Sequence, residues 1–208
     1  MKAHFTVLFF LISILYSTSL KASDDDELTR LLRNISTLTG QFTQTSFDKE
    51  GQPLENYRGL FDIARPDKMA WKIKAPLEQQ IISNGKLLWL YDPDLDQVII
   101  ESAELSLNKS PIALFTSDPS LISQRYKIKS KSIDSYLDFV ITPRDSSSMF
   151  DEIRVRFING LPRDIILMDK FSHKTTIIFD KVKLNSFIAD SAFNFIPPPN
   201  IDIIDNIR

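Results

Sequence analysis

The residues that could carry out chemistry in this chain are few. Cysteine is absent, and of the two histidines His4 lies in an apolar N-terminal segment while His173 stands between Ser172 and Lys174. A thiol nucleophile is thus missing, and one histidine is too few for a typical zinc site. The Gly-x-Ser-x-Gly turn that presents the serine of an α/β-hydrolase does not occur either. We expect His173 to be an exposed turn residue.

Acidic residues are plentiful but indicate no catalytic pair. Asp92, Asp94 and Asp96 resemble part of a calcium-binding loop, yet the glycine and the closing glutamate of such a loop are missing. The other carboxylates fall in turns and on the outward faces of the expected strands. We therefore expect a turn at residues 92–96, no metal, no cofactor, and a protein that is not an enzyme.

Arg65 is the charged residue that the pattern marks most clearly. Alternation along residues 54–64 places it on the apolar face of a strand, together with Tyr57, Phe61 and Ile63. An inward guanidinium must donate hydrogen bonds, either to backbone carbonyls of covering helices or to the head group of a ligand. The alternative is a surface ion pair with Asp62 or Asp67.

Residues 58–93 have the pattern of short apolar strands joined by tight turns. Turn signals occur at Arg65-Pro66, Ala75-Pro76, Asn84-Gly85 and Asp92-Pro93, and Asn-Gly is the strongest short hairpin signal. Alternating strands resume at residue 126 and continue to residue 184. We expect about ten strands in a single antiparallel sheet, and a twisted sheet of that size curls towards an incompletely closed β-barrel.

Three short helices are expected to cover this sheet. Residues 24–38 carry leucine and isoleucine at helical spacing behind a run of acidic residues. Ser110-Pro111 and Asp118-Pro119 each have the form of an N-cap followed by proline. The helices after these two signals would form a lid, with the apolar residues Ile112, Leu114, Phe115, Leu121 and Ile122. The fold class is therefore mainly β with a lid of α-helices.

The first 22 residues have the pattern of a signal peptide. Lys2 precedes an apolar run over residues 5–16, which is too short to span a membrane, and Leu20-Lys21-Ala22 is a plausible cleavage site. Removing Lys2 and Lys21 from the 25 basic residues leaves 23 against 27 acidic residues, a net charge of −4. That charge argues against nucleic acid as a partner and against electrostatic docking on anionic lipid. We expect one domain over residues 23–208.

Apolar ligand binding remains as the positive hypothesis. A concave apolar wall beneath the helices would be formed by Tyr57, Phe61, Ile63, Met69, Trp71, Ile73, Trp89 and Tyr91. The alternative is that these residues form an ordinary core, because most aromatic stripes do.

Several of these segments together resemble the LolA family of periplasmic lipoprotein carriers. The resemblance rests on residues 59–66, Trp71, residues 82–86 and the run Leu88-Trp89-Leu90-Tyr91-Asp92-Pro93. Supporting matches lie in residues 41–44, in the Ser110-Pro111 helix, in residues 137–143 and in residues 193–198. The matches span the chain after residue 22 in one order.

This resemblance implies an unclosed β-barrel whose helical lid covers a cavity for the acyl chains of lipoproteins. Arg65 matches the family's arginine before proline, which bonds the lid when closed and releases it on loading, and Met69 stands where the family has an aromatic residue. The implied location is the periplasm of a Gram-negative bacterium. The implied partners are acylated lipoproteins, an inner-membrane ABC-type lipoprotein release complex and a LolB-like acceptor in the outer membrane, and the implied state is a monomer.

Two alternatives stay open. A LolA-like carrier of another lipid or glycolipid would have the same fold and different cargo. A periplasmic hydrolase or an envelope sensor domain on a similar half-barrel belongs to another class, but the inward positions named above hold no nucleophile or carboxylate pair.

Overall fold

The computed structural model describes residues 23–108 and 110–207, and the predicted signal peptide, residues 1–22, lies outside this part of the chain. A single sheet of 12 strands dominates it, in the order β12-β6-β5-β4-β3-β2-β1-β11-β10-β9-β8-β7. The strands are β1 Thr37–Phe47, β2 Pro53–Ala64, β3 Lys68–Ala75, β4 Gln79–Asn84, β5 Leu87–Asp92, β6 Gln97–Ser102, β7 Tyr126–Ile133, β8 Tyr136–Pro143, β9 Phe150–Ile158, β10 Leu161–Asp169, β11 Lys174–Leu184 and β12 Asp202–Asp205.

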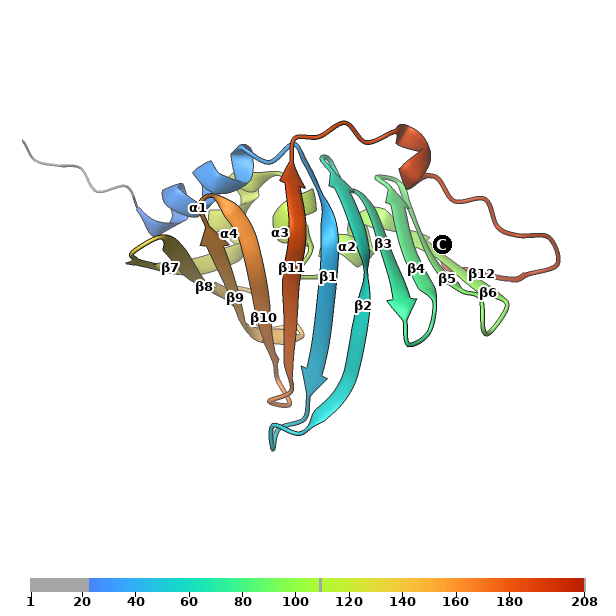
Figure 1. Ribbon diagram of the computed structural model, residues 1–208, viewed down its shortest axis with the longest axis horizontal. Helices are drawn as coiled ribbons and strands as arrows, with labels where there is room; N and C mark the ends of the chain where they lie inside the picture. The colour runs from blue at the N-terminus through green and yellow to red at the C-terminus, as the bar shows by residue number, and fades with distance from the viewer. Residues whose placement is uncertain (1–22, 109, 208) are drawn as a thin grey trace, which may run out of the picture.

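The sheet is strongly curved but does not close (Figure 1). Its neighbouring strands are antiparallel, except that β12 runs parallel to β6. The edge strands β7 and β12 do not pair with each other, so the barrel stays open along one side. The expectation of an incompletely closed, antiparallel barrel is therefore confirmed, with two strands more than expected.

Short helices fill the concave side of this half-barrel. They are α1 Asp24–Arg33, α2 Ala103–Asn108, α3 Ala113–Thr116, the 3-10 helix η1 Pro119–Leu121 and α4 Ile122–Arg125. Their apolar residues belong to the same buried cluster as the inward residues of the sheet. We call residues 110–125 the lid. No helix in the described part of the chain has both the length and the apolar character needed to cross a membrane.

Local sequence signals account for most of these helix boundaries. Ser23 caps α1 by accepting the Asp26 N–H at 3.2 Å, and Asp118 accepts the Ser120 N–H at 2.8 Å at the start of η1. Helix α1 ends at Arg33 and not at residue 38, because the chain turns at Asn34 and enters β1. Ser110 and Pro111 form a turn before α3 and do not cap it. Helix α2 was not expected.

Aromatic side chains join the lid to the sheet. The rings of Phe42 and Trp71 are stacked with their centroids 3.9 Å apart. Phe179 lies edge-on to Phe61 on one side, with centroids 5.1 Å apart, and to Phe115 of α3 on the other, with centroids 6.2 Å apart. Phe61 and Phe115 are almost inaccessible to solvent. The middle of the half-barrel is thus a closely packed core.

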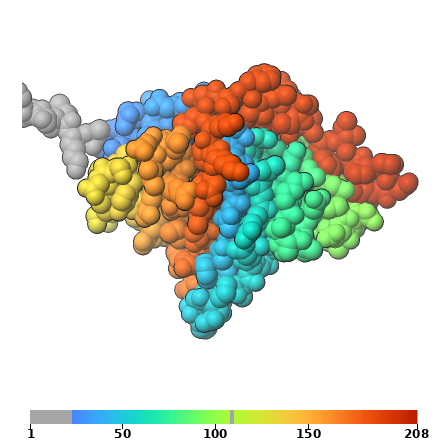
Figure 2. Space-filling model, viewed as in Figure 1, coloured from blue at the N-terminus to red at the C-terminus, as the bar shows by residue number. Residues whose placement is uncertain are grey.

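The convex side of strands β3 to β6 is also covered. The chain after β11, residues 186–207, crosses it as a strap that includes the 3-10 helix η2 Asp190–Phe193 and ends in β12; Figure 2 shows this strap in red along the upper margin of the molecule. Phe193 is buried against Ala70, Ile82 and Trp89, and the Lys68 ammonium pairs with Asp190 at 2.8 Å. A second, smaller core therefore lies outside the half-barrel.

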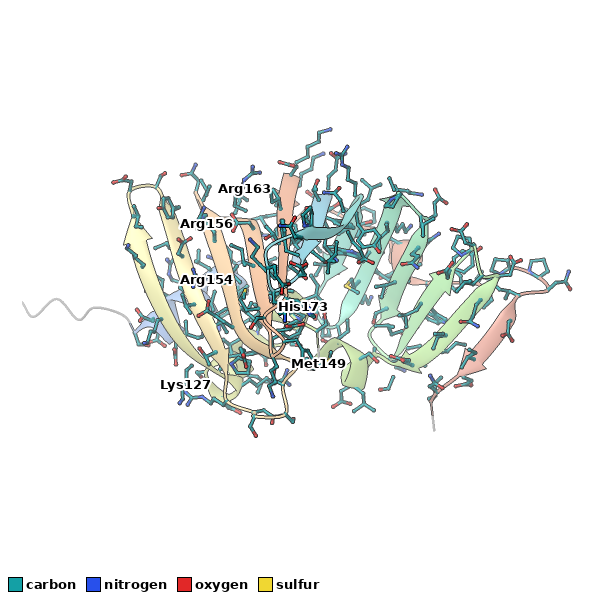
Figure 3. All side chains as sticks on the ribbon, turned by 90° about the horizontal axis from the view of Figure 1, so that it is seen from below. Lys127, Met149, Arg154, Arg156, Arg163 and His173 are labelled. Atoms are coloured by element: carbon teal, nitrogen blue, oxygen red, sulfur yellow. The ribbon has the colours of Figure 1, made fainter. Side chains whose placement is uncertain are left out.

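The convex side of strands β7 to β10 carries charged residues instead. Lys127, Lys129 and Lys131 are exposed on the outer face of β7. On β9, Arg156 pairs with Asp138 at 2.7 Å and Arg154 pairs with Glu152 at 2.6 Å; Figure 3 shows Arg154, Arg156 and Arg163 along this side of the sheet. The two halves of the sheet therefore differ: one buries both faces and the other buries only the concave face.

The last edge of the sheet lies closer to the end of the chain than the sequence pattern indicates. Residues 193–196, followed by three prolines, have the pattern of a last edge segment, but Phe193 ends η2 and residues 194–201 form no strand. The edge strand is β12, four exposed residues paired with β6.

Candidate functional site

Arg65 lies directly after β2 and reaches into the lid. Its backbone N–H donates to the Ser36 carbonyl at 3.1 Å. Its guanidinium Nε donates to the carbonyl of Ser117 at 3.0 Å, and Nη2 donates to the carbonyl of Leu114 at 3.1 Å. Nη1 donates to the carbonyls of Leu32 and Ile35. One side chain thus makes four hydrogen bonds to backbone groups of the covering helices.

These four carbonyls share one property: they lie at or just beyond the C-terminal ends of α1 and α3. Carbonyls in the last turn of a helix lack partners within the helix, and a guanidinium carries five donors in a fixed planar arrangement. Arg65 therefore completes two helix ends at once. The prediction that it bonds lid carbonyls is confirmed. Among the described residues, Arg65 forms neither of the alternative ion pairs: Asp62 accepts from the Thr39 hydroxyl at 2.6 Å, and Asp67 accepts from the Ser117 hydroxyl at 3.5 Å.

Partial burial shifts the pKa of this arginine. Desolvation lowers the pKa of Arg65 to about 10, although the charges of Asp118 and Asp67 oppose the shift. Arg65 therefore remains a cation at neutral pH. Burial likewise raises the pKa of Asp67, chiefly by desolvation, against the hydrogen bond from Ser117.

The turn that carries Arg65 is itself fastened to the lid and to the sheet. The Asp67 N–H donates to the Thr116 carbonyl at 3.1 Å, and the Ser83 hydroxyl donates to the Asp67 carbonyl at 2.7 Å. Ser83 is completely buried. We call Arg65 together with this turn the latch, because it joins α1, α3 and the hairpin β2–β3.

An apolar cavity of about 270 Å³ lies beside this core, on the concave face. One wall comes from β3 and β4, with Met69, Trp71 and Ile81, and the opposite wall comes from β10 and β11, with Ile165, Leu167 and Ile177. Ile112 of the lid and Phe150 of β9 also line it. An apolar cavity of about 150 Å³ holds one benzene molecule, so 270 Å³ holds roughly ten carbon atoms, which is part of one long acyl chain.

The residues predicted for the wall divide into three groups. Met69 and Trp71 line the cavity. Four more share their face and pack in the same core without lining the cavity, namely Tyr57, Phe61, Ile63 and Ile73. The prediction that Trp89 and Tyr91 belong to this wall is wrong, because both face the convex side and pack under the strap. There the ring centroids of Tyr91 and Phe195 are 5.1 Å apart.

The lid residues lie where the sequence predicted them. Ile112, Leu114, Phe115 and Ile122 are buried in the main core, and Leu121 is half-buried. The far wall of the cavity, from β10 and β11, was not predicted from the sequence. Its signal was present in the alternation of Ile165 with Leu167, but only the pairing of β11 with β1 brings these strands opposite β3.

The residues that could carry out chemistry lie in turns. His173 is half-exposed in the β10–β11 turn and lies 3.0 Å from Asp169, as predicted for a turn residue. Asp92 accepts the N–H groups of Asp94 and Leu95 and so shapes the predicted turn. Within residues 23–108 and 110–207, no three His, Cys, Asp or Glu residues are grouped so as to hold a metal ion.

Comparison with known proteins agrees with this geometry. The family model described as outer membrane lipoprotein carrier protein LolA matches residues 33–196. The chain is 36% identical to an outer-membrane lipoprotein carrier protein of Pseudomonas paraeruginosa over 199 residues, which cover 94% of this chain and 96% of the relative. It is 37% identical to the protein of the same description from Azotobacter vinelandii over 177 residues, covering 85% and 86%.

Solved structures show the same fold at much lower sequence identity. A LolA superfamily protein from Nitrosomonas europaea superposes with a TM-score of 0.50 at 15% identity, covering 84% of this chain and 99% of the other. An uncharacterized conserved protein from Thermus thermophilus superposes with a TM-score of 0.54 at 11% identity, covering 88% and 100%. From the family match and the near full-length relatives, the chain belongs to the LolA family of outer membrane lipoprotein carrier proteins.

Proposed function

We propose that this protein is a periplasmic carrier that shields the acyl chains of lipoproteins and delivers them to the outer membrane. The observation that carries the proposal is an apolar cavity roofed by helices that one half-buried arginine holds in place through four backbone carbonyls. Its relatives are named outer-membrane lipoprotein carrier proteins. The protein acts by binding and release and not by catalysis.

The energetics of acyl chains explain why such a carrier needs a covered cavity. Each buried CH₂ group is worth about 0.8 kcal/mol, so a free lipoprotein with several acyl chains leaves a membrane at a prohibitive cost. A carrier that hides the chains removes most of this cost. It must also release them, so part of the binding energy has to be used for something other than affinity.

Opening the latch uses this part of the binding energy. In the closed form the cavity holds only part of one chain, so loading requires the lid and α1 to move away from the sheet and Arg65 to give up its four carbonyls. A ligand shifts such a two-state element only by binding the open form better than the closed one. Arg65 is the gating residue in this proposal, and Met69, Trp71 and the buried residues beneath the lid are the acyl-binding surface.

The proposal also assigns a route. The protein is exported through the signal peptide of residues 1–22 and works as a monomer in the periplasm. It receives acylated lipoproteins from an ABC-type release complex in the inner membrane and passes them to a LolB-like acceptor in the outer membrane.

The test is a release assay with a matched pair of cavity variants. Purified protein, residues 23–208, is added to spheroplasts, and newly made lipoproteins are sought in a soluble complex with it. Ile177→Trp fills the cavity, whereas Ile178→Trp places the same side chain on the opposite, partly exposed face of β11. We expect release by the wild type and by Ile178→Trp, and a loss with Ile177→Trp.

Two results would overturn the proposal. If the wild type releases no lipoprotein and lipid extracts of the purified protein contain a different acyl ligand, the carrier has another cargo. If Ile177→Trp, shown to be folded by circular dichroism, releases lipoproteins as well as Ile178→Trp does, the cavity is not the acyl site.

A further inference from the structure

A second, larger hollow of about 850 Å³ adjoins the apolar cavity. It lies between the start of the lid, the end of α4 and the loop that joins β8 to β9. Ser110, Pro111 and Phe150 line both the hollow and the cavity, so the two spaces meet at these three residues. We call this hollow the anchor groove. Its volume falls within the range of about 300–1,000 Å³ that is usual for small-molecule sites.

The anchor groove differs from the cavity in chemistry. Its floor is apolar, with Phe150, Ile153 and Tyr126. Its rim carries charged and hydroxyl groups, among them Arg125, Arg144, Asp145, Ser147 and Ser148. A ligand that lies across both spaces therefore meets apolar surface at one end and hydrogen-bonding groups at the other.

Arg144 is held at this rim by its own backbone and side-chain contacts. Its N–H donates to the Arg125 carbonyl at 2.9 Å, and its Nε donates to the carbonyls of Ser123 and Tyr126 at 3.0 and 3.1 Å. These bonds use Nε alone. Among the residues that the structure describes, the terminal Nη groups of Arg144 have no acceptor, so two pairs of N–H donors remain available in a fixed position.

The loop that forms the outer rim is well fastened. The Asp145 carboxylate accepts both the N–H and the hydroxyl of Ser147 at 2.8 Å. The Lys170 ammonium donates to the Ser146 carbonyl, and the Lys170 N–H donates to the Met149 carbonyl at 3.3 Å. Figure 3 shows Met149 of this loop near His173, which lies in the turn between β10 and β11. The groove is therefore preformed and does not depend on a ligand to order its rim.

We propose that the anchor groove binds the polar head of the cargo's lipid anchor, while the acyl chains continue past Phe150 and Pro111 into the cavity. This inference rests on the carrier function proposed above. The head consists of the ester and amide carbonyls that join the chains to the modified N-terminal residue of a lipoprotein. Carbonyl oxygens accept hydrogen bonds from guanidinium groups, and the Nη groups of Arg144 supply such donors on this rim.

Two pairs of variants test the groove. Arg144→Ala removes the donors, and its control Arg154→Ala removes an exposed arginine of β9 that is paired with Glu152. Ser147→Trp blocks the groove sterically, and its control Ser146→Trp adds the same bulk to the neighbouring exposed residue, which does not line the groove. Ser147→Trp keeps the inference testable if Arg144→Ala loosens the end of α4.

Each protein is titrated with two probes, a synthetic triacylated lipopeptide and palmitate, which has the chain without the ester-linked head. We expect Arg144→Ala and Ser147→Trp to bind the lipopeptide about tenfold more weakly, the effect of one hydrogen bond to a charged group, and palmitate as the wild type does. Both controls should match the wild type with either probe.

The outcomes separate this inference from the function on which it rests. If the wild type binds both probes and neither groove variant weakens the lipopeptide, the groove is not the head site and the carrier function stands. If the groove variants weaken both probes equally, the groove is not a separate subsite. If the wild type binds neither probe, the inference and the carrier function fall together.

Discussion

Replacing Arg65 with leucine should uncouple loading from release. The four hydrogen bonds from its guanidinium contribute about 1.5 kcal/mol each at the low end for charged donors, or about 6 kcal/mol in total. Burial lowers the pKa of Arg65 to about 10, which corresponds to a cost of about 3 kcal/mol for keeping the charge there. The net stabilisation of the closed arrangement of α1 and the lid is therefore about 3 kcal/mol.

Arg65→Leu loses this stabilisation and removes one donor from each of the four carbonyls in the closed form, although the Leu32 carbonyl still accepts the Ile35 N–H. The equilibrium between closed and open lid should shift by about a hundredfold towards the open form, since each 1.4 kcal/mol is a factor of ten. Lipoproteins should then bind more tightly, because less of their binding energy is used to open the lid. Transfer to an acceptor should become slower for the same reason.

The assay loads each protein with a labelled lipoprotein and follows its transfer to vesicles that carry the outer-membrane acceptor. Arg58→Leu is the control, because Arg58 is exposed on the same strand, β2. Arg65→Lys should lie between wild type and Arg65→Leu, since one ammonium cannot reach four carbonyls. Normal transfer by Arg65→Leu, or weaker loading than wild type, would refute the reasoning.

Three further predictions concern the framework around the site. Gly59→Ala should destabilise the protein by at least 2 kcal/mol in thermal unfolding, because the new Cβ would lie 2.1 Å from the Lys72 carbonyl oxygen; an unchanged melting temperature would contradict this. Phe193→Ala should lower the free energy of unfolding by about 3–5 kcal/mol and expose the strap to proteolysis. Phe187→Ala, which alters a side chain that is 93% exposed, should change neither the stability nor the proteolysis of the strap. Hydrogen bonds from Ser147 lower the pKa of Asp145. The support that Asp145 gives to its loop is therefore complete above its ordinary pKa of 3.8 and is lost as the pH falls through the lower folded value. Protection of the amides in residues 145–149 against exchange, relative to the intrinsic rate at each pH, should therefore fall only below about pH 4, and a fall near pH 6 would contradict this.

The sequence predicted best where one face of an element alone is apolar. On β3, Met69, Trp71 and Ile73 alternate with lysines, and the structure buries this face against the concave core. Arg65 could be identified because a charge on an apolar face requires partners, and helix ends are the usual place to find unpaired carbonyls. Features that depend on physical constraints within a few residues could therefore be predicted from the sequence.

The errors arose where distant segments decide the outcome. Strand β5 is apolar on both faces, since Leu88 and Leu90 face the core while Trp89 and Tyr91 lie under the strap. Alternation alone does not show which of these two faces of β5 points towards the cavity. Strand β12 was missed because its four residues are all exposed, and only its pairing with β6, about a hundred residues earlier, makes it a strand.

The strap has a mechanical consequence for a half-barrel that must make room for bulky cargo. Strands β3 to β6 are packed on both faces, so bending them would disturb two cores. Strands β7 to β10 have solvent and exposed charged side chains behind them, so they can change their twist while disturbing only one core. The half-barrel thus has a stiff wall and a compliant wall, and the compliant one borders both the anchor groove and the cavity. Expansion on loading should be one-sided, with the strap and the strands beneath it forming the fixed frame against which the other half flexes.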